Sequence, residues 1–208
     1  MTTAKGSKHI GITMHEVFAH LPDEPCDTLS HDWHAYMRFA LPEAKWTPIP
    51  NLGRETVINY LTDHDIDGLI LSGGNDIGDN CRRDETEQAL LEHCLERNLP
   101  VLGISRGMEQ IQVHLGGELT RIDSRVHVNT THPIRAQNGP DGIGWCGIRT
   151  VNSDHEYGIP FDALHPSLYS LATTNDNWVE AALMRDRPVG GLMWHPEREK
   201  TFNLRDKA

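Results

Sequence analysis

The stretch VLGISRGMEQ, at positions 101–110, carries the first group that could do chemistry. Within it, residues 103–107 read G-x-S-x-G, the sharp turn between a strand and a helix on which many hydrolases present a nucleophilic serine. At such an elbow the third residue, here Ser105, stands above the sheet beside backbone N–H groups of a helix N-terminus, which can stabilise an oxyanion. The motif therefore predicts nucleophilic catalysis at position 105.

A nucleophile also needs a base and a group that orients the base. The triplet His195-Pro196-Glu197 directly follows the apolar run VGGLMW at 189–194. Because side chains at i and i+2 of an extended segment lie on the same side, His195 and Glu197 can address the same spot. We expect Ser105, His195 and Glu197 to form a triad.

The elements that must position these residues alternate between strands and helices. Short apolar runs predict strands at 9–13, 68–71 and 99–104, and a Pro-interrupted edge strand at 46–52. Helical periodicity predicts helices at 27–40, 54–64, 84–98 and 106–115. This alternation predicts an α/β fold with a mainly parallel central sheet and helices on both faces.

The character of the chain changes beyond Gly116-Gly117. Residues 124–144 are polar and rich in Gly, Pro, Asn and His, so we expect a long surface loop. Short β-like runs follow at 147–152, 168–173, 178–184 and 189–194. With no internal repeat and no clear boundary, we expect one domain over residues 1–208.

Composition excludes several classes of partner. The chain has 19 Lys and Arg against 30 Asp and Glu, a formal charge of −11, which argues against binding nucleic acid or an anionic membrane surface. No run of 18 apolar residues is present, and the first residues lack the apolar core of a signal peptide. We expect a cytoplasmic location.

Cysteine and histidine patterns do not suggest a metal or a disulfide framework. The four cysteines are far apart and form no C-x-x-C pair. Among the 13 histidines, His31 with His34 and His127 with His132 are close in sequence, but no matching carboxylate or cysteine arrangement accompanies them. We therefore expect solvated or hydrogen-bonded histidines, and neither a metal site nor a redox cofactor.

Three separated motifs resemble those of class I glutamine amidotransferase-like proteins: the elbow at 103–107, which reads G-I-C-x-G there, the WHPE segment at 194–197, and SGG at 72–74. Finer details resemble the stand-alone gamma-glutamyl hydrolases of this superfamily, namely ILSGGND at 70–76, Arg83-Asp84 before a helix containing Glu87, and VNSDH at 151–155. The resemblance covers about residues 9–200. It implies a flavodoxin-like sheet with a small antiparallel β region.

Within that branch the compact chain is most similar to the gamma-glutamyl-CDP-amidate hydrolases of bacterial capsule or lipopolysaccharide phosphoramidate biosynthesis. The resemblance implies hydrolysis of a gamma-glutamyl phosphoramidate to L-glutamate and cytidine diphosphoramidate, without a cofactor. The partner would be a small gamma-glutamyl molecule linked to a nucleotide. The group on the glutamyl nitrogen and the oligomeric state stay open, a homodimer being one option.

The resemblance also assigns roles to particular residues. It places the oxyanion-stabilising N–H groups at Gly74 and Arg106, and substrate contacts at Gly73, Asn75, Asp76, Glu109, Asn152, Ser153, Asp154 and His155. Glu109 and a basic residue from the 120s could hold the α-ammonium and α-carboxylate of the glutamyl group.

Plainer roles are open for several of these residues. Glu109 could be a solvated helix carboxylate, Asn75 and Asp76 could shape the turn after Gly74, and Asp154 and His155 could only hydrogen-bond the loop. Arg83 with Asp84 could pair locally and cap the following helix.

Two positions depart from the family pattern, which has cysteine at the elbow and continues C-x-G-x-Q, whereas this chain has Ser105 and Glu109. A thiol beside histidine ionises near neutral pH, while a serine hydroxyl must lose its proton during attack, so the replacement should remove most activity. Ser105 could be an engineered replacement that traps substrate, a natural serine nucleophile, or the mark of a natural pseudo-enzyme.

Three other functions remain open. A serine α/β-hydrolase normally takes its acid from a separate strand before the histidine, whereas Glu197 follows His195. A glutaminase subunit would need a synthetase partner, because this chain has no synthetase domain. A non-catalytic module could bind gamma-glutamyl compounds through a degraded site.

Overall fold

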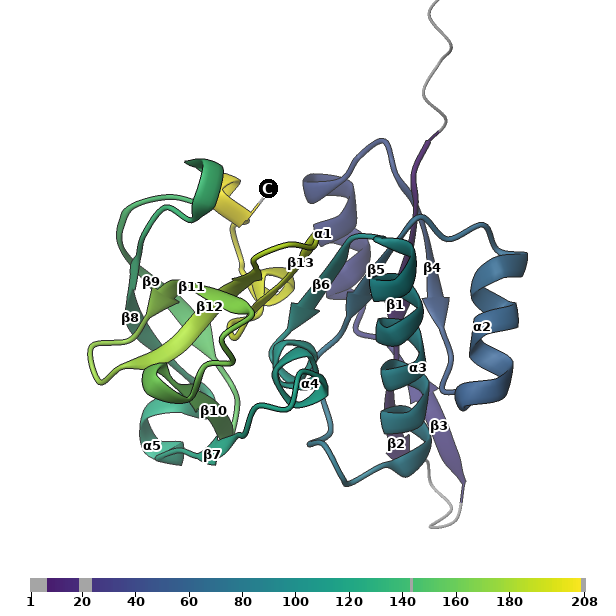
Figure 1. Ribbon diagram of the computed structural model, residues 1–208, viewed down its shortest axis with the longest axis horizontal. Helices are drawn as coiled ribbons and strands as arrows, with labels where there is room; N and C mark the ends of the chain where they lie inside the picture. The colour runs from purple at the N-terminus through teal and green to yellow at the C-terminus, as the bar shows by residue number, and fades with distance from the viewer. Residues whose placement is uncertain (1–6, 19–23, 143, 207–208) are drawn as a thin grey trace, which may run out of the picture.

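The computed structural model describes residues 7–18, 24–142 and 144–206. Its main sheet has the strand order β4-β1-β5-β6-β13-β12-β11-β8-β9 (Figure 1). The first five strands of this order are parallel to one another: β4 (Lys45–Ile49), β1 (His9–Thr13), β5 (Gly68–Leu71), β6 (Val101–Ile104) and β13 (Val189–Leu192). The predicted α/β fold with a mainly parallel central sheet is confirmed.

Helices cover both faces of the parallel half. One face carries α2 (Arg54–Asp63), α3 (Cys81–Arg97) and α4 (Arg106–His114), and the opposite face carries α1 (Asp32–Ala40). The alternation of side chains along β5 shows why both faces need cover. Leu69 and Leu71 pack toward α2, α3 and α4, whereas Ile70 packs toward α1.

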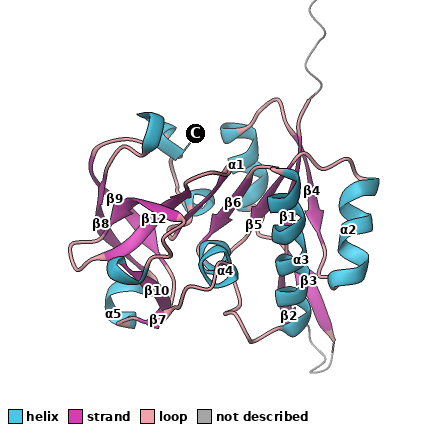
Figure 2. Cartoon of the chain, viewed as in Figure 1, coloured by secondary structure: helices cyan, strands magenta, loops and turns pink. Residues whose placement is uncertain are grey.

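The second half of the chain forms the antiparallel part of the sheet (Figure 2). It consists of β12 (Trp178–Met184), β11 (Leu168–Thr173), β8 (Thr130–Ala136) and β9 (Gly147–Ser153), with β10 (Tyr157–Pro160) joining β12 to β7 (Thr120–Arg121). Short 3₁₀ turns lie at Pro140–Gly142, Phe161–Ala163, Pro196–Arg198 and Leu204–Asp206. The small antiparallel β region is therefore present.

The predicted long surface loop at 124–144 is wrong. Helix α5 (Ser124–His127) and strand β8 occupy most of it, and β8 pairs with β9 along its whole length. Every second residue of β8 is buried, namely His132, Ile134 and Ala136. The alternation of buried and exposed residues along β8 is hard to recognise in the sequence, because two of its buried positions hold a histidine and an alanine instead of large apolar residues.

The predicted helix at 27–40 begins later, at Asp32. The residues before it form β3 (Pro25–Thr28), which pairs with β2 (His15–Phe18) in a separate two-stranded sheet. Asp27 is held in this extended segment because its carboxylate accepts hydrogen bonds from the backbone N–H and the side-chain amide of Asn51.

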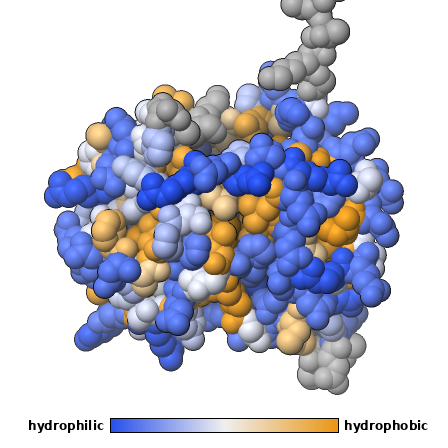
Figure 3. All heavy atoms as spheres, in the orientation of Figure 1, coloured by the Kyte–Doolittle hydropathy of each residue, from blue (hydrophilic) through white to orange (hydrophobic). Residues whose placement is uncertain are grey.

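One face of the molecule is seen to be mainly polar in the space-filling view (Figure 3). In Figure 3 hydrophilic side chains cover most of the visible face, and hydrophobic ones show mainly near its middle. None of the helices in the described ranges is both long enough and apolar enough to cross a membrane.

Candidate active site

The elbow between β6 and α4 presents Ser105. Its backbone has φ 52° and ψ −111°, a left-handed conformation that non-glycine residues rarely adopt and that clusters at functional sites. The Ser105 N–H donates to Leu192 O at 2.7 Å, which ties the elbow to the end of β13. Gly107 allows the turn to pack against β5, because a Cβ there would collide with the carbonyl oxygen of Leu71.

His195 and Glu197 form a buried pair directly after β13. His195 Nδ1 lies 2.7 Å from Glu197 Oε1, and their side chains are 1% and 4% exposed. A proton on Nδ1 donates to the carboxylate, so the other ring nitrogen, Nε2, can accept a proton from a nucleophile. Because β6 and β13 are adjacent parallel strands with Ile104 opposite Leu192, Ser105 and His195 both emerge from the same edge of the sheet.

Asn152, at the end of β9, fixes the backbone of His195 from both sides. Its amide Nδ2 donates to His195 O at 2.8 Å, and its Oδ1 accepts from His195 N at 2.9 Å. The same Nδ2 lies 2.8 Å from Glu199 Oε1. Strand β9 of the antiparallel half thus fixes the backbone of His195, which follows strand β13 of the parallel half.

The loop after β5 is oriented by Arg83. The buried guanidinium donates from Nη2 to the carbonyl oxygens of Ser72, at 2.8 Å, and Gly73, at 3.0 Å. Since a trans peptide points its N–H opposite to its carbonyl, these bonds fix where the N–H groups of Gly73 and Gly74 point. Gly73 must be glycine, because an added Cβ would lie 2.5 Å from Cε1 of His195.

Fixed N–H groups at this loop and at the start of α4 suit the predicted oxyanion role of Gly74 and Arg106. Arg106 is the first residue of α4, where a backbone N–H has no partner within the helix. Gly74 has φ 115°, which only glycine adopts without strain.

A buried ion network supports both loops. Glu87 accepts hydrogen bonds from Arg83 Nε, at 3.1 Å, from the Thr13 hydroxyl, at 2.7 Å, and from the Arg106 guanidinium. Burial alone would raise the pKa of Glu87, but Arg106, Arg83 and the Thr13 hydroxyl hold it below its usual value. The carboxylate is therefore ionised between two buried cations.

The prediction that Arg83 and Asp84 pair locally and cap α3 needs correction. The cap is Asn80, whose Oδ1 accepts from Arg83 N at 2.9 Å, and Asp84 pairs with Arg106 instead. The signal was present in the sequence, because Arg83 and Glu87 are spaced i, i+4 and lie on one face of the helix.

Asn75 anchors the strand β2. Its Oδ1 accepts from Glu16 N at 3.0 Å and from Arg83 Nη1 at 3.3 Å, and its Nδ2 donates to Glu16 O at 2.9 Å. These contacts favour the plainer structural role for Asn75. Burial and the neighbouring Asp79 raise the pKa of half-buried Asp76.

Glu109, one turn into α4, is not a solvated helix carboxylate. It is 3% exposed, and burial together with Asp76 raises its pKa to about 8, against the opposing effect of Arg106. Two carboxyl groups near the elbow make an environment that favours a cation. The basic residues of the 120s, Arg121 and Arg125, pair on the surface with Glu156 and Asp123.

The other residues of the VNSDH segment point in different directions. Asp154 is half-exposed and pairs with Arg198 at 2.7 Å, and Ser153 is buried and donates to His127 O at 2.7 Å. His155 is buried, and its Nδ1 bonds to Tyr157 O at 2.7 Å. Burial lowers the pKa of His155 to about 3, so this imidazole is neutral.

The expectation that no carboxylate accompanies the histidines is wrong. His127, His132 and His155 converge in the interior on Glu180 of β12, which sequence reasoning missed. Glu180 is the third residue of the run WVEAALM, where a lone carboxylate between apolar residues is the signal that could have found it.

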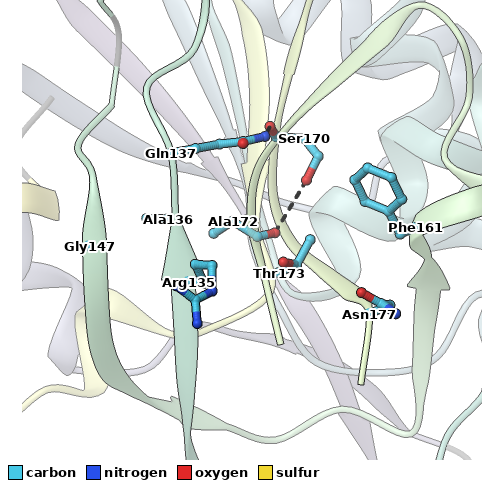
Figure 4. A pocket seen from close by; sticks show the side chains of 9 residues that line it. All are labelled: Arg135, Ala136, Gln137, Gly147, Phe161, Ser170, Ala172, Thr173 and Asn177. Carbon is cyan, nitrogen blue, oxygen red and sulfur yellow. Dashed lines mark hydrogen bonds between the residues drawn. The ribbon is translucent and has the colours of Figure 1, made fainter. Parts of the chain in front are cut away.

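Two of the cavities on the antiparallel half differ in their relation to the triad. An open groove of about 470 Å³ beside the His195 backbone is lined by Asn129, Thr130, Thr131, Asn152, Ser153, Asp154 and Arg198. A second cavity of about 380 Å³, drawn in Figure 4, is lined by Arg135, Phe161, Asn177 and others, and by none of the predicted site residues. Of these two, the groove is therefore the cavity relevant to the triad.

Residues 10–197 match the Peptidase C26 family. The gamma-glutamyl-CDP-amidate hydrolase of Campylobacter jejuni subsp. jejuni serotype O:2 is 29% identical over 201 residues, which cover 93% of this chain and 92% of that protein. One subunit of the glutamine-hydrolysing GMP synthase of Methanococcus aeolicus is 29% identical over 145 residues, or 67% of this chain and 69% of that one. A crystal structure of a glutamine amidotransferase from Thermotoga maritima superposes with a TM-score of 0.65 over 91% of this chain and 76% of that one, at 12% identity.

The fold, the strained elbow and the His195–Glu197 pair define an amide hydrolase of the class I glutamine amidotransferase-like kind. Within that class, this chain belongs to the Peptidase C26 family.

Proposed function

We propose that this protein hydrolyses the bond between a gamma-glutamyl group and a phosphoramidate nitrogen, with gamma-glutamyl-CDP-amidate as substrate and L-glutamate and cytidine diphosphoramidate as products. The observation that carries the proposal is the buried His195–Glu197 pair beside the elbow that presents residue 105. The relative from Campylobacter jejuni, similar over nearly the whole of both chains, supports the substrate. The proposal assigns the reaction to the bacterial cytoplasm, in capsule or lipopolysaccharide phosphoramidate biosynthesis.

The chemistry follows from the triad when residue 105 is cysteine. His195 Nε2 accepts the thiol proton as sulfur attacks the gamma-carbonyl carbon, and Glu197 stabilises the imidazolium that forms. The oxyanion accepts hydrogen bonds from the N–H groups of Gly74 and Arg106. The C–N bond then breaks, and His195 protonates the leaving nitrogen. Water, deprotonated by His195, hydrolyses the thioester to release glutamate and restore the thiol.

Ser105, in place of the cysteine, disables this sequence of steps. Its hydroxyl has a far higher pKa than a thiol, so His195 must remove the proton in the transition state rather than beforehand. The position, the strained backbone and the His–Glu pair are all retained, which supports replacement of a cysteine rather than a decayed site.

The glutamyl end of the substrate requires groups of both charges. The carboxyls of Glu109 and Asp76, near the elbow, form the side that receives the α-ammonium. Glu109 is protonated below about pH 8 in the free protein. Binding of the α-ammonium favours the ionised carboxylate, so substrate binding below this pH should release a proton from Glu109.

The leaving group occupies the groove beside His195. Asn152 lines this groove and holds the backbone of the base, so a ligand in the groove lies next to the scissile bond. Arg198 lines this groove and pairs with Asp154. Its guanidinium can bind the diphosphate of the substrate when it leaves Asp154.

A substrate comparison tests the proposal. The Ser105→Cys variant is assayed for glutamate release from gamma-glutamyl-CDP-amidate, glutamine and simple gamma-glutamyl amines, with Ser105→Cys/His195→Ala as the control. The proposal requires the highest kcat/KM with the CDP-amidate. A preference for glutamine would support the glutaminase function that the similarity to the Methanococcus aeolicus GMP synthase favours. Binding without turnover of any of the three would leave a non-catalytic binding module.

A further inference from the structure

A second cluster of ionisable side chains lies inside the antiparallel half, in the part of Figure 1 where α5, β8, β10 and β12 meet. His127 ends α5, His132 is on β8, His155 lies between β9 and β10, and Glu180 is the third residue of β12. All four are buried, and one ligand atom from each lies within 4.8 Å of the others. The triad does not use any of them.

The polar atoms that face one another in this cluster lack hydrogen-bond partners within the described part of the chain. They include both carboxylate oxygens of Glu180, both ring nitrogens of His127, and His155 Nε2. Leaving a buried polar atom unpaired costs about 1–3 kcal/mol each, so such a concentration calls for a ligand.

The hydrogen bond of His155 determines which of its nitrogens is bare. Nδ1 donates its proton to the backbone carbonyl of Tyr157, at 2.7 Å, so Nε2 carries a lone pair toward Glu180. At 3.7 Å this lone pair and Glu180 Oε1 are too far apart to share a proton, whichever of the two groups holds it. A cation between them satisfies both.

The spacing fits a small tetrahedral ion. Glu180 Oε1 lies 3.6 Å from His132 Nε2 and 3.7 Å from His155 Nε2. Four ligands at 2.0–2.1 Å from a tetrahedral zinc ion lie about 3.4 Å from one another, so these two pairs must close by only a few tenths of an ångström. The widest pair in the cluster, which lies within 4.8 Å, must close by at most about 1.4 Å. The backbone is already fixed, because His127 O accepts from Ser153 Oγ and from His155 N.

We propose that His127, His132, His155 and Glu180 bind one zinc ion in a closed structural site. Three imidazoles and a carboxylate suit zinc better than calcium or magnesium, which prefer oxygen ligands. Four protein ligands, none more than 6% exposed, leave no open position for water or substrate. The ion carries two positive charges and the carboxylate one negative charge, which leaves one positive charge at the site.

The consequence of this site is mechanical. Zinc joins α5, β8, β12 and the segment between β9 and β10, in addition to the strand pairing and apolar packing of this half. His155 is three residues after Asn152, the residue that fixes the His195 backbone. The ion therefore stiffens the support of the triad without touching substrate.

The test measures metal in the tag-free chain, purified after growth with added zinc. Elemental analysis should find one zinc per chain after gel filtration, and X-ray absorption should show nitrogen and oxygen neighbours at about 2.0–2.1 Å without sulfur. Removing the ion with a chelator should lower the Tm, and adding zinc back should restore it.

Variants assign the ion to the cluster. Glu180→Gln, which keeps the side-chain shape, and His155→Ala should each weaken zinc binding by about 100-fold or more, whereas the exposed controls Glu118→Gln and His31→Ala should not change it. Absence of zinc from the unmodified chain even after incubation with excess zinc would overturn the proposal. So would bound zinc that all the variants retain, because it would lie elsewhere on the surface.

Discussion

Replacing Glu109 by glutamine should stabilise the protein, and increasingly so as the pH rises. In the folded chain burial raises the pKa of this carboxyl from the usual 4.5 to about 8. The folded state therefore keeps a proton that the unfolded state releases near pH 4.5. Between these two pH values the unfolded state binds fewer protons, so the stability of the unmodified chain falls as pH increases.

The size of the effect follows from the two pKa values. At 1.36 kcal/mol per pH unit, the carboxyl lowers the free energy of unfolding by about 1 kcal/mol at pH 5 and about 4 kcal/mol at pH 8. Glutamine has nearly the same shape and does not titrate. The stability gained by Glu109→Gln should therefore grow by about 3 kcal/mol over this range.

Urea unfolding of the two proteins at pH 5, 6, 7 and 8 measures this difference. Glu118→Gln, which changes an exposed carboxyl, is the control for the substitution itself. A difference between Glu109→Gln and the unmodified chain that stays constant with pH would refute the reasoning, because it would mean that Glu109 ionises alike in both states.

Three further predictions concern the supports of the triad. In the Ser105→Cys background, Asn152→Ala should lower kcat by about 10- to 100-fold with little change in KM, because it removes the hydrogen bonds that hold the His195 backbone. Steady-state assays measure this effect, and the control Ser153→Ala should have a smaller one. Gly73→Ala should abolish glutamate release because its Cβ collides with the His195 ring, and Gly78→Ala, whose Cβ meets no atom within 4 Å and which introduces backbone strain at φ 99° without touching the His195 ring, should retain release. Glu87→Gln should lower the free energy of unfolding at pH 7 by about 3–5 kcal/mol, measured by urea unfolding, because it leaves two buried guanidiniums without a full countercharge. This difference should shrink as the pH falls through the range where Glu87 takes up a proton. Equal stability of the two proteins at pH 7 would contradict the account of the network.

The parallel half of the fold could be predicted because its signals are local. The runs at 68–71 and 101–104 are continuously apolar, since both faces of those strands are covered, and they end in the loops that carry the chemistry. His195 and Glu197 could be paired because they are spaced i, i+2 after the run at 189–194, and their side chains are in contact. Helix α1 was predicted too long because its apolar periodicity does not reveal where the side chain of Asp27 finds its partner.

The antiparallel half was harder to predict for a physical reason. Its strands meet residues distant in sequence, so the burial of a polar side chain there depends on partners that no local pattern shows. The sequence of strand β8 predicts a loop because His132 stands at an inward position. The histidine cluster was missed for the same reason, since Glu180 is 53 residues from His127 along the chain and adjacent to it only in the fold.

The most direct test of the central claim measures single-turnover glutamate release from gamma-glutamyl-CDP-amidate by the unmodified chain, Ser105→Cys and Ser105→Ala. We predict that Ser105→Cys releases glutamate at least about 100-fold faster than the unmodified chain, through a glutamyl-enzyme adduct at residue 105 visible by mass spectrometry. Ser105→Ala should set the background. Equal release by all three proteins, or none by any of them, would contradict the assignment of residue 105 as the nucleophile.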